Sequence, residues 1–461
     1  MLPIPKKQLT LFAVILISFF NPFMGAAVNI ALPAISTEFQ MSAVALSWVA
    51  MAFLLSSAVF QLPAGKLADL TGRHRIFTLG VVIMSGGSLL CTLAPSATWL
   101  LIFRFLQGTG GALVFGTGMA LLTSAFPPQE RGKVLGYNVA VVYLGLSAAP
   151  VLGGVLTQYF GWRSLFYINA AAGVIVTATM LSALWHGKPE ERRNEPFDLI
   201  GTFLYVASLS ALMLGLSMIP QFSGILFSAA GVGGLLLFAN YEQRKPFPVF
   251  HMQLFLGNRV FAFSNLSALI NYAATFGVTF LLSLYLQQIR MLTPGEAGMV
   301  LVAQPVVMTL SSLLSGRLSD HFDARVLASG GMALSTLGLL LFVFLSSDAS
   351  HLFIVTGLII LGLGFGLFSA PNTHAVMSAV DKENLGTASA TIGTMRLTGQ
   401  MVSMALATLT IHLFLGNQPI QAENREAFME SIRVAFFLFT LLCFGGIFAS
   451  LARGPKITPT N

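Results

Sequence analysis

Two short charged segments are the clearest candidates for chemistry in this 461-residue chain. The first, Gly65 to Arg75, interrupts two long apolar stretches, and a weaker copy, Gly316 to Arg325, follows 251 residues later. Glycine permits a tight turn, and aspartate can accept hydrogen bonds from a helix N-terminus or pair with an arginine. The first segment reads as a polar loop closed by such bonds. Its repetition predicts a duplicated chain.

A single arginine, Arg104, falls in the middle of an apolar stretch and is followed by Gln107. An arginine at this depth of a membrane is costly, so it is expected to face a cavity and a partner. It cannot serve as a proton carrier, because a guanidinium stays protonated in proteins. Arg104 therefore predicts a polar site rather than a proton-binding one.

The composition identifies lipid as the solvent of this chain. Apolar residues make up 55% of the sequence and charged residues only 9%, far below the charge of a soluble domain. The net charge of +7 does not indicate nucleic-acid binding, because no basic patch lies on a soluble module. The two cysteines, Cys91 and Cys443, have no ligand spacing, so neither a metal site nor any other cofactor is expected.

Apolar stretches long enough to cross a bilayer occur fourteen times. We expect them at residues 9–32, 43–64, 76–94, 98–124, 134–157, 164–185, 199–219, 222–241, 260–286, 296–316, 326–346, 351–371, 385–412 and 434–452. If the seventh and eighth are an insertion, the two charged segments each follow the second span of a six-span half. We therefore expect an all-α fold with an N-terminal bundle (1–186), a linker with two extra spans (187–254) and a C-terminal bundle (255–461).

The positions of Lys and Arg predict the orientation. Of the 24 basic residues, eighteen fall on one side of the expected spans and four on the other, while Arg104 and Arg396 lie within spans. Basic residues gather on the cytoplasmic side, so both termini and both charged segments are expected there.

These residues resemble the major facilitator superfamily, and within it the fourteen-span drug:proton antiporter branch. Residues 65–75 match the superfamily's G-x-L-a-D-r-x-G-r-r signature, and Arg104 to Gly108 resembles its R-x-x-q-G signature. The resemblance implies that the charged segments gate the cytoplasmic side, shut in one state and open in the other. The implied gating residues are Gly65, Asp69, Gly72, Arg73, Arg75, Gly316, Asp320 and Arg325.

A third signature lies in the fifth span. Gly145, Pro150, Gly153 and Gly154 are close to the antiporter signature g-x-x-x-G-P-x-x-G-G, with Ala149 in place of a glycine. Small residues let two helices touch, and proline frees a backbone carbonyl. The resemblance implies a bendable hinge.

The chain departs from the branch at its proton-coupling position. Five residues before Asn29, where the branch usually has a carboxylate, stands Met24, and no expected span has a central Asp or Glu. A proton-coupled carrier needs a group whose charge changes, usually a buried carboxylate. Coupling through a boundary acid, no coupling, and a cavity suited to anionic or neutral amphiphiles all stay open. The boundary acids are Glu38, Asp69, Asp198 and Glu296.

A substrate cavity can be outlined from polar residues inside the expected spans. The candidates are Asn21, Asn29, Gln61, Arg104, Gln107, Asn271, Tyr272, Gln304, Asn372 and Arg396. The 39 Phe and 19 Met would make such a cavity greasy and adaptable, although most of them simply face lipid or neighbouring helices.

The expected function is efflux of amphiphilic small molecules by alternating access, with proton antiport. The alternative is export of anionic or neutral amphiphiles or metabolites with no or atypical coupling. We expect a monomer in the bacterial inner membrane. An enzyme acting on lipid-linked substrates is disfavoured because the seven His residues are scattered. A transport-inactive sensor on the same fold is disfavoured by the intact signatures.

Overall fold

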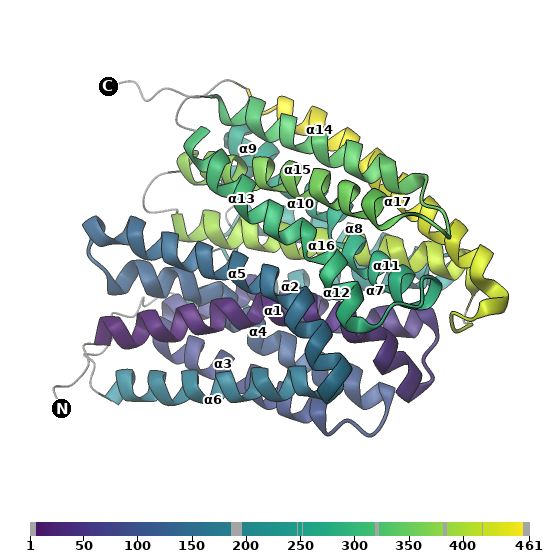
Figure 1. Ribbon diagram of the computed structural model, residues 1–461. Coiled ribbons are helices and arrows are strands. Elements are labelled where there is room, and N and C mark those ends of the chain that lie inside the picture. Colours follow the sequence, from purple (N-terminus) through teal and green to yellow (C-terminus); the bar gives the residue numbers. More distant parts are fainter. Residues whose placement is uncertain are drawn as a thin grey trace. The chain divides into compact units, whose positions relative to one another are not determined.

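The computed structural model describes residues 6–185, 196–246, 248–250, 252–318, 322–380, 385–416 and 418–454. All regular structure in these ranges is helical, as the composition predicts. The helices run side by side within each part of the chain (Figure 1).

The first eight helices cover the first half of the chain. They are α1 Lys6–Phe39, α2 Ala43–Thr71, α3 Arg73–Thr92, α4 Ala97–Ala125, α5 Pro128–Phe160, α6 Arg163–Trp185, α7 Leu199–Met218 and α8 Phe222–Glu242. The remaining elements are α9 Met252–Gly257, α10 Arg259–Thr275, α11 Gly277–Leu284, the π-helix η1 Tyr285–Ile289, α12 Pro294–Leu301, α13 Ala303–Leu318, α14 Ala324–Val343, α15 His351–Ser378, α16 Leu385–Leu415, the short η3 Ala422–Asn424 and α17 Arg425–Leu451.

Fourteen helical segments of the described chain are long and apolar enough to cross a membrane, which confirms the predicted count. Two of these segments are composite. The ninth, Arg259–Ile289, joins α10, α11 and η1, and the tenth, Pro294–Gly316, joins α12 and most of α13. The helices extend past the apolar stretches at many ends, because the backbone continues to form hydrogen bonds after the hydrophobic pattern stops.

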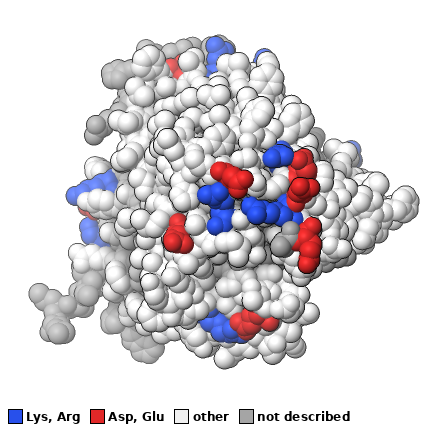
Figure 2. Space-filling model, turned by 45° about the vertical axis from the view of Figure 1, so that its right-hand side comes forward, with Lys and Arg blue, Asp and Glu red and all other residues white. Residues whose placement is uncertain are grey.

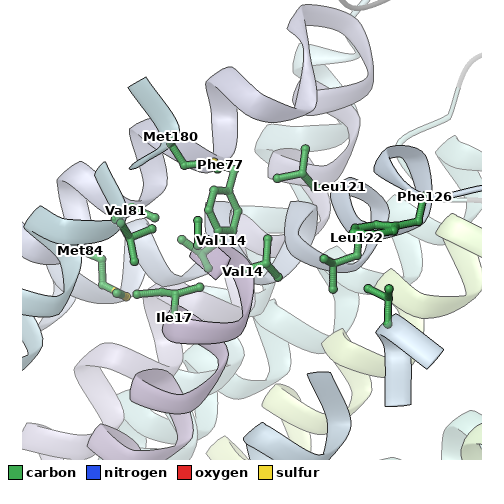
Figure 3. Close-up of a cluster of buried hydrophobic side chains, with 13 residues drawn as sticks. Val14, Ile17, Phe77, Val81, Met84, Val114, Leu121, Leu122, Phe126 and Met180 are labelled. Atoms are coloured by element: carbon green, nitrogen blue, oxygen red, sulfur yellow. The ribbon is translucent and has the colours of Figure 1, made fainter. Parts of the chain in front are cut away.

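Contacts divide the chain into two compact units, which are described separately. Unit 1 comprises Met1–Val249, Ser283–Met299 and Asn417–Ile420, and unit 2 comprises the rest. In unit 1, buried side chains from α1, α3, α4 and α6, with Val134 of α5, form one apolar core around Phe77 (Figure 3). This core packs α3, which begins with Arg73 of the first charged segment, against α4, which carries Arg104.

Local sequence signals set several helix ends. Ser42 and Ser350 accept a backbone N–H at the starts of α2 and α15, as N-cap residues do. Gly72 joins α2 to α3 with φ of 113°, and Gly161 joins α5 to α6 with φ of 77°. L-residues with side chains rarely adopt these angles, so glycine is required at both corners.

The two extra spans, α7 and α8, form a close pair in unit 1. A Cβ built on Gly231 would fall within 3 Å of Leu212, and Tyr205 Oη donates to Ala58 O of α2 at 3.1 Å. Their outward residues are large and apolar, with Phe203 71% and Leu236 68% exposed. Such exposure suits a lipid-facing surface. On the face in Figure 2, by contrast, acidic and basic side chains gather in a few clusters.

Candidate functional site

The first charged segment is a corner between two helices. The sequence predicted a polar loop here, and that prediction is wrong. Residues 65–71 continue α2, because the helical hydrogen bonds extend through the charged residues up to Gly72. Asp69 Oδ1 accepts from Arg73 Nη2 at 2.8 Å and from Nε at 3.0 Å. Arg73 also donates to Ala120 O of α4 at 3.5 Å. A half-buried ion pair therefore bridges the Gly72 corner and reaches a third helix.

Further contacts hold this corner in unit 1. Gly65 lies against the backbone of α4. A Cβ built on Gly65 would lie 3.8 Å from Gly116 O. His74 Nε2 lies 3.3 Å from Thr10 Oγ1 of α1, in a buried position. Arg75, by contrast, is exposed.

The second charged segment follows α13 in unit 2. Gly316 lies in the last turns of α13, and a Cβ built on it would meet no neighbouring atom within 4 Å. Arg325 is in the first turn of α14. Asp323 Oδ1 accepts from Arg325 N at 2.8 Å and so caps α14. Asp320 lies outside the described residues. Sequence reasoning did not identify the cap, although an aspartate just before a helix signals one.

Arg104 is 3% exposed on α4, and all its polar contacts are neutral. Its Nε donates to Val49 O of α2 at 2.8 Å, and its Nη1 donates to Gln107 Oε1 at 2.5 Å. The guanidinium carbon lies 4.8 Å from the centre of the Phe53 ring. Met24 is buried as well. The partners of Arg104 are therefore a backbone carbonyl and a side-chain amide.

A buried chain of hydrogen bonds continues from Arg104. Gln107 Nε2 donates to Ser88 Oγ of α3 at 2.6 Å, and Asn169 Nδ2 of α6 donates to the same oxygen at 2.7 Å. The network thus joins α2, α3, α4 and α6. Sequence reasoning found Gln107 but missed Ser88, because a serine in an apolar span usually bonds to its own helix.

Glu38 is bound near the C-terminal end of α1. Both its oxygens accept from Arg163, each at 2.6 Å, and Oε2 also accepts from Trp162 Nε1 at 2.8 Å. Arg163 Nε donates to Thr92 O, which adds α3 to the clamp. Bidentate, charge-assisted pairs of this kind are strong and specific. Glu38 therefore fastens α1, α3 and α6 together.

The other two boundary acids outside the charged segment cap helices. Glu296 Oε2 accepts from Thr293 N and Oγ1, both at 2.9 Å, at the start of α12. Asp198 Oδ1 accepts from Gly201 N at 2.9 Å at the start of α7, and from Tyr241 Oη at 3.2 Å. With Asp69 paired to Arg73, all four acids nominated from the sequence make structural bonds.

Glu242 is a buried carboxylate that sequence reasoning did not select as a candidate. It ends α8 and is 2% exposed. A Cβ on Gly201 would lie 2.7 Å from Asp198 Oδ2 and closer still to Glu242 Oε1. Asp198 Oδ2 and Glu242 Oε1 thus both lie within 2.7 Å of one point, so these two carboxylate oxygens are at most twice 2.7 Å apart. An acid at the end of an apolar stretch was the available signal, but burial depended on how α7 and α8 pack.

The small residues of α5 form a seam with its neighbours in unit 1. Gly145 packs on Phe19 O of α1, and a Cβ on Gly153 would lie 2.7 Å from that of Ala27. Gly154 packs on the carbonyl oxygen of Pro294, the first residue of α12, and Gly298 packs on Pro150 O. The third signature thus provides close backbone contact on two sides.

The remaining cavity candidates divide between the units. In unit 1, Asn21, Asn29 and Gln61 are buried. Backbone carbonyls next to this set accept hydrogen bonds: Ser283 donates to Asn29 O at 2.9 Å and Gln287 donates to Ile30 O at 3.0 Å. In unit 2, Asn271 and Asn372 are buried, while Tyr272, Gln304 and Arg396 are half-buried.

Comparison with a model of a protein family identifies the family of this chain. The model of the Major Facilitator Superfamily matches residues 14–265 and 264–460, which is nearly the whole chain. The chain belongs to the Major Facilitator Superfamily. It is therefore a multi-pass membrane transporter rather than an enzyme, and its fourteen candidate spans agree with the fourteen-span branch that the sequence resembles.

Several facilitators are similar in sequence. The Riboflavin transporter RibZ of Clostridioides difficile is 29% identical over 96% of both chains. The Multidrug resistance protein Stp of Mycobacterium tuberculosis is 33% identical over 84% of this chain and 73% of its own. The Drug efflux pump JefA of the same species is 28% identical over 89% and 82%.

A solved facilitator structure supports the fold. A bacterial homolog of the human lysosomal transporter Spinster, in an inward-facing and unoccupied conformation, aligns with a TM-score of 0.71 over 98% of both chains. The identity is 19%, so this likeness shows the facilitator fold alone.

Proposed function

We propose that this facilitator exports amphiphilic small molecules by alternating access between two six-span halves. The α5 seam is the observation that carries the proposal, because small residues at Gly145, Gly153 and Gly154 give close backbone contacts on two sides of one helix. Such contacts can form and break without large side chains rearranging. The relatives named as a multidrug resistance protein and a drug efflux pump support export of amphiphiles.

Flux in proteoliposomes tests this function. Cationic, neutral and anionic fluorescent amphiphiles are loaded in parallel, and riboflavin is included because one relative bears that name. We expect saturable flux of at least one class above that of empty vesicles. Flux that is no faster than in protein-free vesicles, for every class, would contradict the proposal.

A second candidate concerns coupling and charge preference. All polar partners of Arg104 are neutral, and the four boundary acids make structural bonds. These observations favour export of neutral or anionic amphiphiles with no or atypical proton coupling over antiport through a span carboxylate. An imposed pH gradient separates the two: acceleration of flux supports antiport, and unchanged flux supports the second candidate.

The membrane setting follows from the charge distribution. We propose a monomer in the bacterial inner membrane with both termini in the cytoplasm and with domains 1–186, 187–254 and 255–461. The excess of basic residues at one end of the spans supports this orientation. Labelling of single cysteines introduced at Lys133 and at Asp348 from either side of the membrane tests it, because the two positions should react from opposite sides.

A further inference from the structure

Spans nine and ten are divided between the two units. Most of span nine lies in unit 2, whereas Ser283–Met299, which ends span nine and begins span ten, lies in unit 1. This segment, called the 283–299 hairpin, packs on the first helices of the chain although it belongs in sequence to the last six spans. A movement between the two halves must therefore release the hairpin from these helices or bend both spans where they change unit.

The hairpin is bound to α1 at a carbonyl that lacks its usual helical donor. In an α-helix the oxygen of one residue accepts from the N–H of the fourth residue after it. The fourth residue after Asn29 is Pro33, inside α1, and proline has no N–H. Ser283 Oγ donates to Asn29 O at 2.9 Å. The Ser283 hydroxyl thus takes the place of the missing N–H.

Gln287, in the π-helix η1, makes the neighbouring bond. Its Nε2 donates to Ile30 O and to Ser283 Oγ, each at 3.0 Å. Ile30 differs from Asn29, because the fourth residue after it is Ala34, which has an N–H. Gln287 therefore adds a further bond to α1, whereas Ser283 supplies one that α1 cannot make by itself.

The hairpin also contacts α5 through uncharged groups. Gly295 N donates to Gln158 Oε1 at 3.1 Å, and Gly154 packs on Pro294 O. All these bonds to α1 and α5 join neutral groups, in contrast to the ion pair at the Gly72 corner. Neutral contacts of this kind can be exchanged for bonds to water without separating charges.

The Ser283 bond should favour one arrangement of the hairpin over another. With the hairpin on α1, Ser283 is 0% and Asn29 2% exposed, so the carbonyl depends on the hydroxyl for a donor. A buried carbonyl without a donor is costly. With the hairpin away from α1, water can donate to Asn29 O instead. The hydroxyl therefore stabilises the closed arrangement selectively.

We propose that the Ser283 hydroxyl is a latch, which replaces the N–H that Pro33 lacks and so holds the 283–299 hairpin on α1. Gln287 supports the latch through Ile30 O. This inference rests on the proposed alternating access, and it identifies a contact that breaks and re-forms at the end of the spans opposite to the Gly72 corner. Ser283 and Gln287 are positioning residues, because they act on α1 and not on the substrate.

Hydrogen–deuterium exchange of the purified full-length protein in detergent tests the latch. Ser283→Ala should make the amides of residues 283–299 exchange about tenfold faster, the effect of about one lost buried hydrogen bond, and leave those of α3 unchanged. Ser56→Ala is the matched control, because Ser56 is equally buried in unit 1 but donates to Ala52 O of its own helix at 3.1 Å. Unchanged exchange in Ser283→Ala, or an equal change in the control, would overturn the latch.

Restoring the missing N–H tests the role of Pro33. Pro33→Ala places an N–H four residues after Asn29, so the carbonyl no longer depends on Ser283. In this background we expect Ser283→Ala to change the exchange of the hairpin by less than about twofold, as a double-mutant cycle measures. A tenfold effect in both backgrounds would overturn the latch, because a general loosening of the packing would not depend on residue 33.

Gln287 gives a second comparison, which serves if Pro33→Ala does not fold. Gln287→Met removes the amide donor and keeps a long side chain, while Ile30 O retains the N–H of Ala34. We expect this variant to accelerate exchange of the hairpin clearly less than Ser283→Ala does. An equal or larger acceleration would overturn the role assigned to the carbonyl of Asn29.

Failure of the latch and failure of the export function are distinguishable, because exchange is measured without substrate. An effect of Ser283→Ala that depends on Pro33, without flux in proteoliposomes, would support the latch and contradict export. Flux above that of protein-free vesicles, with unchanged exchange in Ser283→Ala, would support export and contradict the latch.

Discussion

At the scale of single residues, Arg104 shows how an arginine can be held in a span without a carboxylate. A backbone carbonyl, an amide oxygen and an aromatic ring together surround its guanidinium. The sequence predicts that this arginine has a polar partner, since an unpaired charge in a span is costly. It does not predict which one, because Val49 O comes from a helix whose packing depends on the whole of unit 1.

Replacing Arg104 should destabilise the protein. Arg104→Met leaves Val49 O and Gln107 Oε1 without their charged donor, which costs about 1–3 kcal/mol for buried groups. We expect the melting temperature in detergent to fall by several degrees, as about 1–3 kcal/mol implies for a folded domain. Lys133→Met, at an exposed position, is the control. If the Arg104→Met variant has the same melting temperature as the wild type, the hydrogen-bond network does not hold the helices together.

Glu38 is expected to act as a clamp rather than as a proton carrier. Glu38→Gln should keep transport and its response to pH while losing at most about 1 kcal/mol of stability, because the ion pair is partly exposed. Flux measured with and without a pH gradient checks this. Loss of a pH response that the wild type has would identify Glu38 as the coupling group.

At the scale of elements, hydrophobic stretches were enough to predict the fourteen spans, because length and apolarity decide which segments cross a membrane. The helix corner at Gly72 could not be predicted from the sequence. Charged residues such as Asp69 and Arg73 occur in helix ends as readily as in loops, so their presence did not show that the helices continue up to Gly72. Burial of Glu242 also needed the structure, because it follows from the pairing of α7 with α8.

The α5 seam predicts a sharp difference between two glycines of the same helix. Gly153→Ala would bring two methyl groups to 2.7 Å, whereas Gly136→Ala meets nothing within 4 Å. We expect the first to reduce flux about tenfold, equivalent to about 1.4 kcal/mol, and the second to leave it unchanged. Equal flux in both variants would show that close contact at the seam is not needed.

At the scale of the whole molecule, the facilitator fold follows from a duplicated chain whose two charged segments lie at corresponding places. The first segment holds an ion pair at a helix corner, and the second caps a helix with Asp323. The two copies have therefore diverged in their bonds while keeping their place in the fold. The first copy is the one expected to gate transport.

The initial rate of amphiphile flux in proteoliposomes, measured for charge variants of the Gly72 corner, tests the gate most directly. We expect Asp69→Lys to insert normally and to transport at about a tenth of the wild-type rate or less, a loss of about 1.4 kcal/mol or more. Adding Arg73→Asp, which restores an ion pair of reversed polarity, should recover part of the rate. Glu130→Lys, a reversal in an exposed pair with Lys7, is the control and should transport normally. Wild-type flux by the Asp69→Lys variant would contradict the gating role.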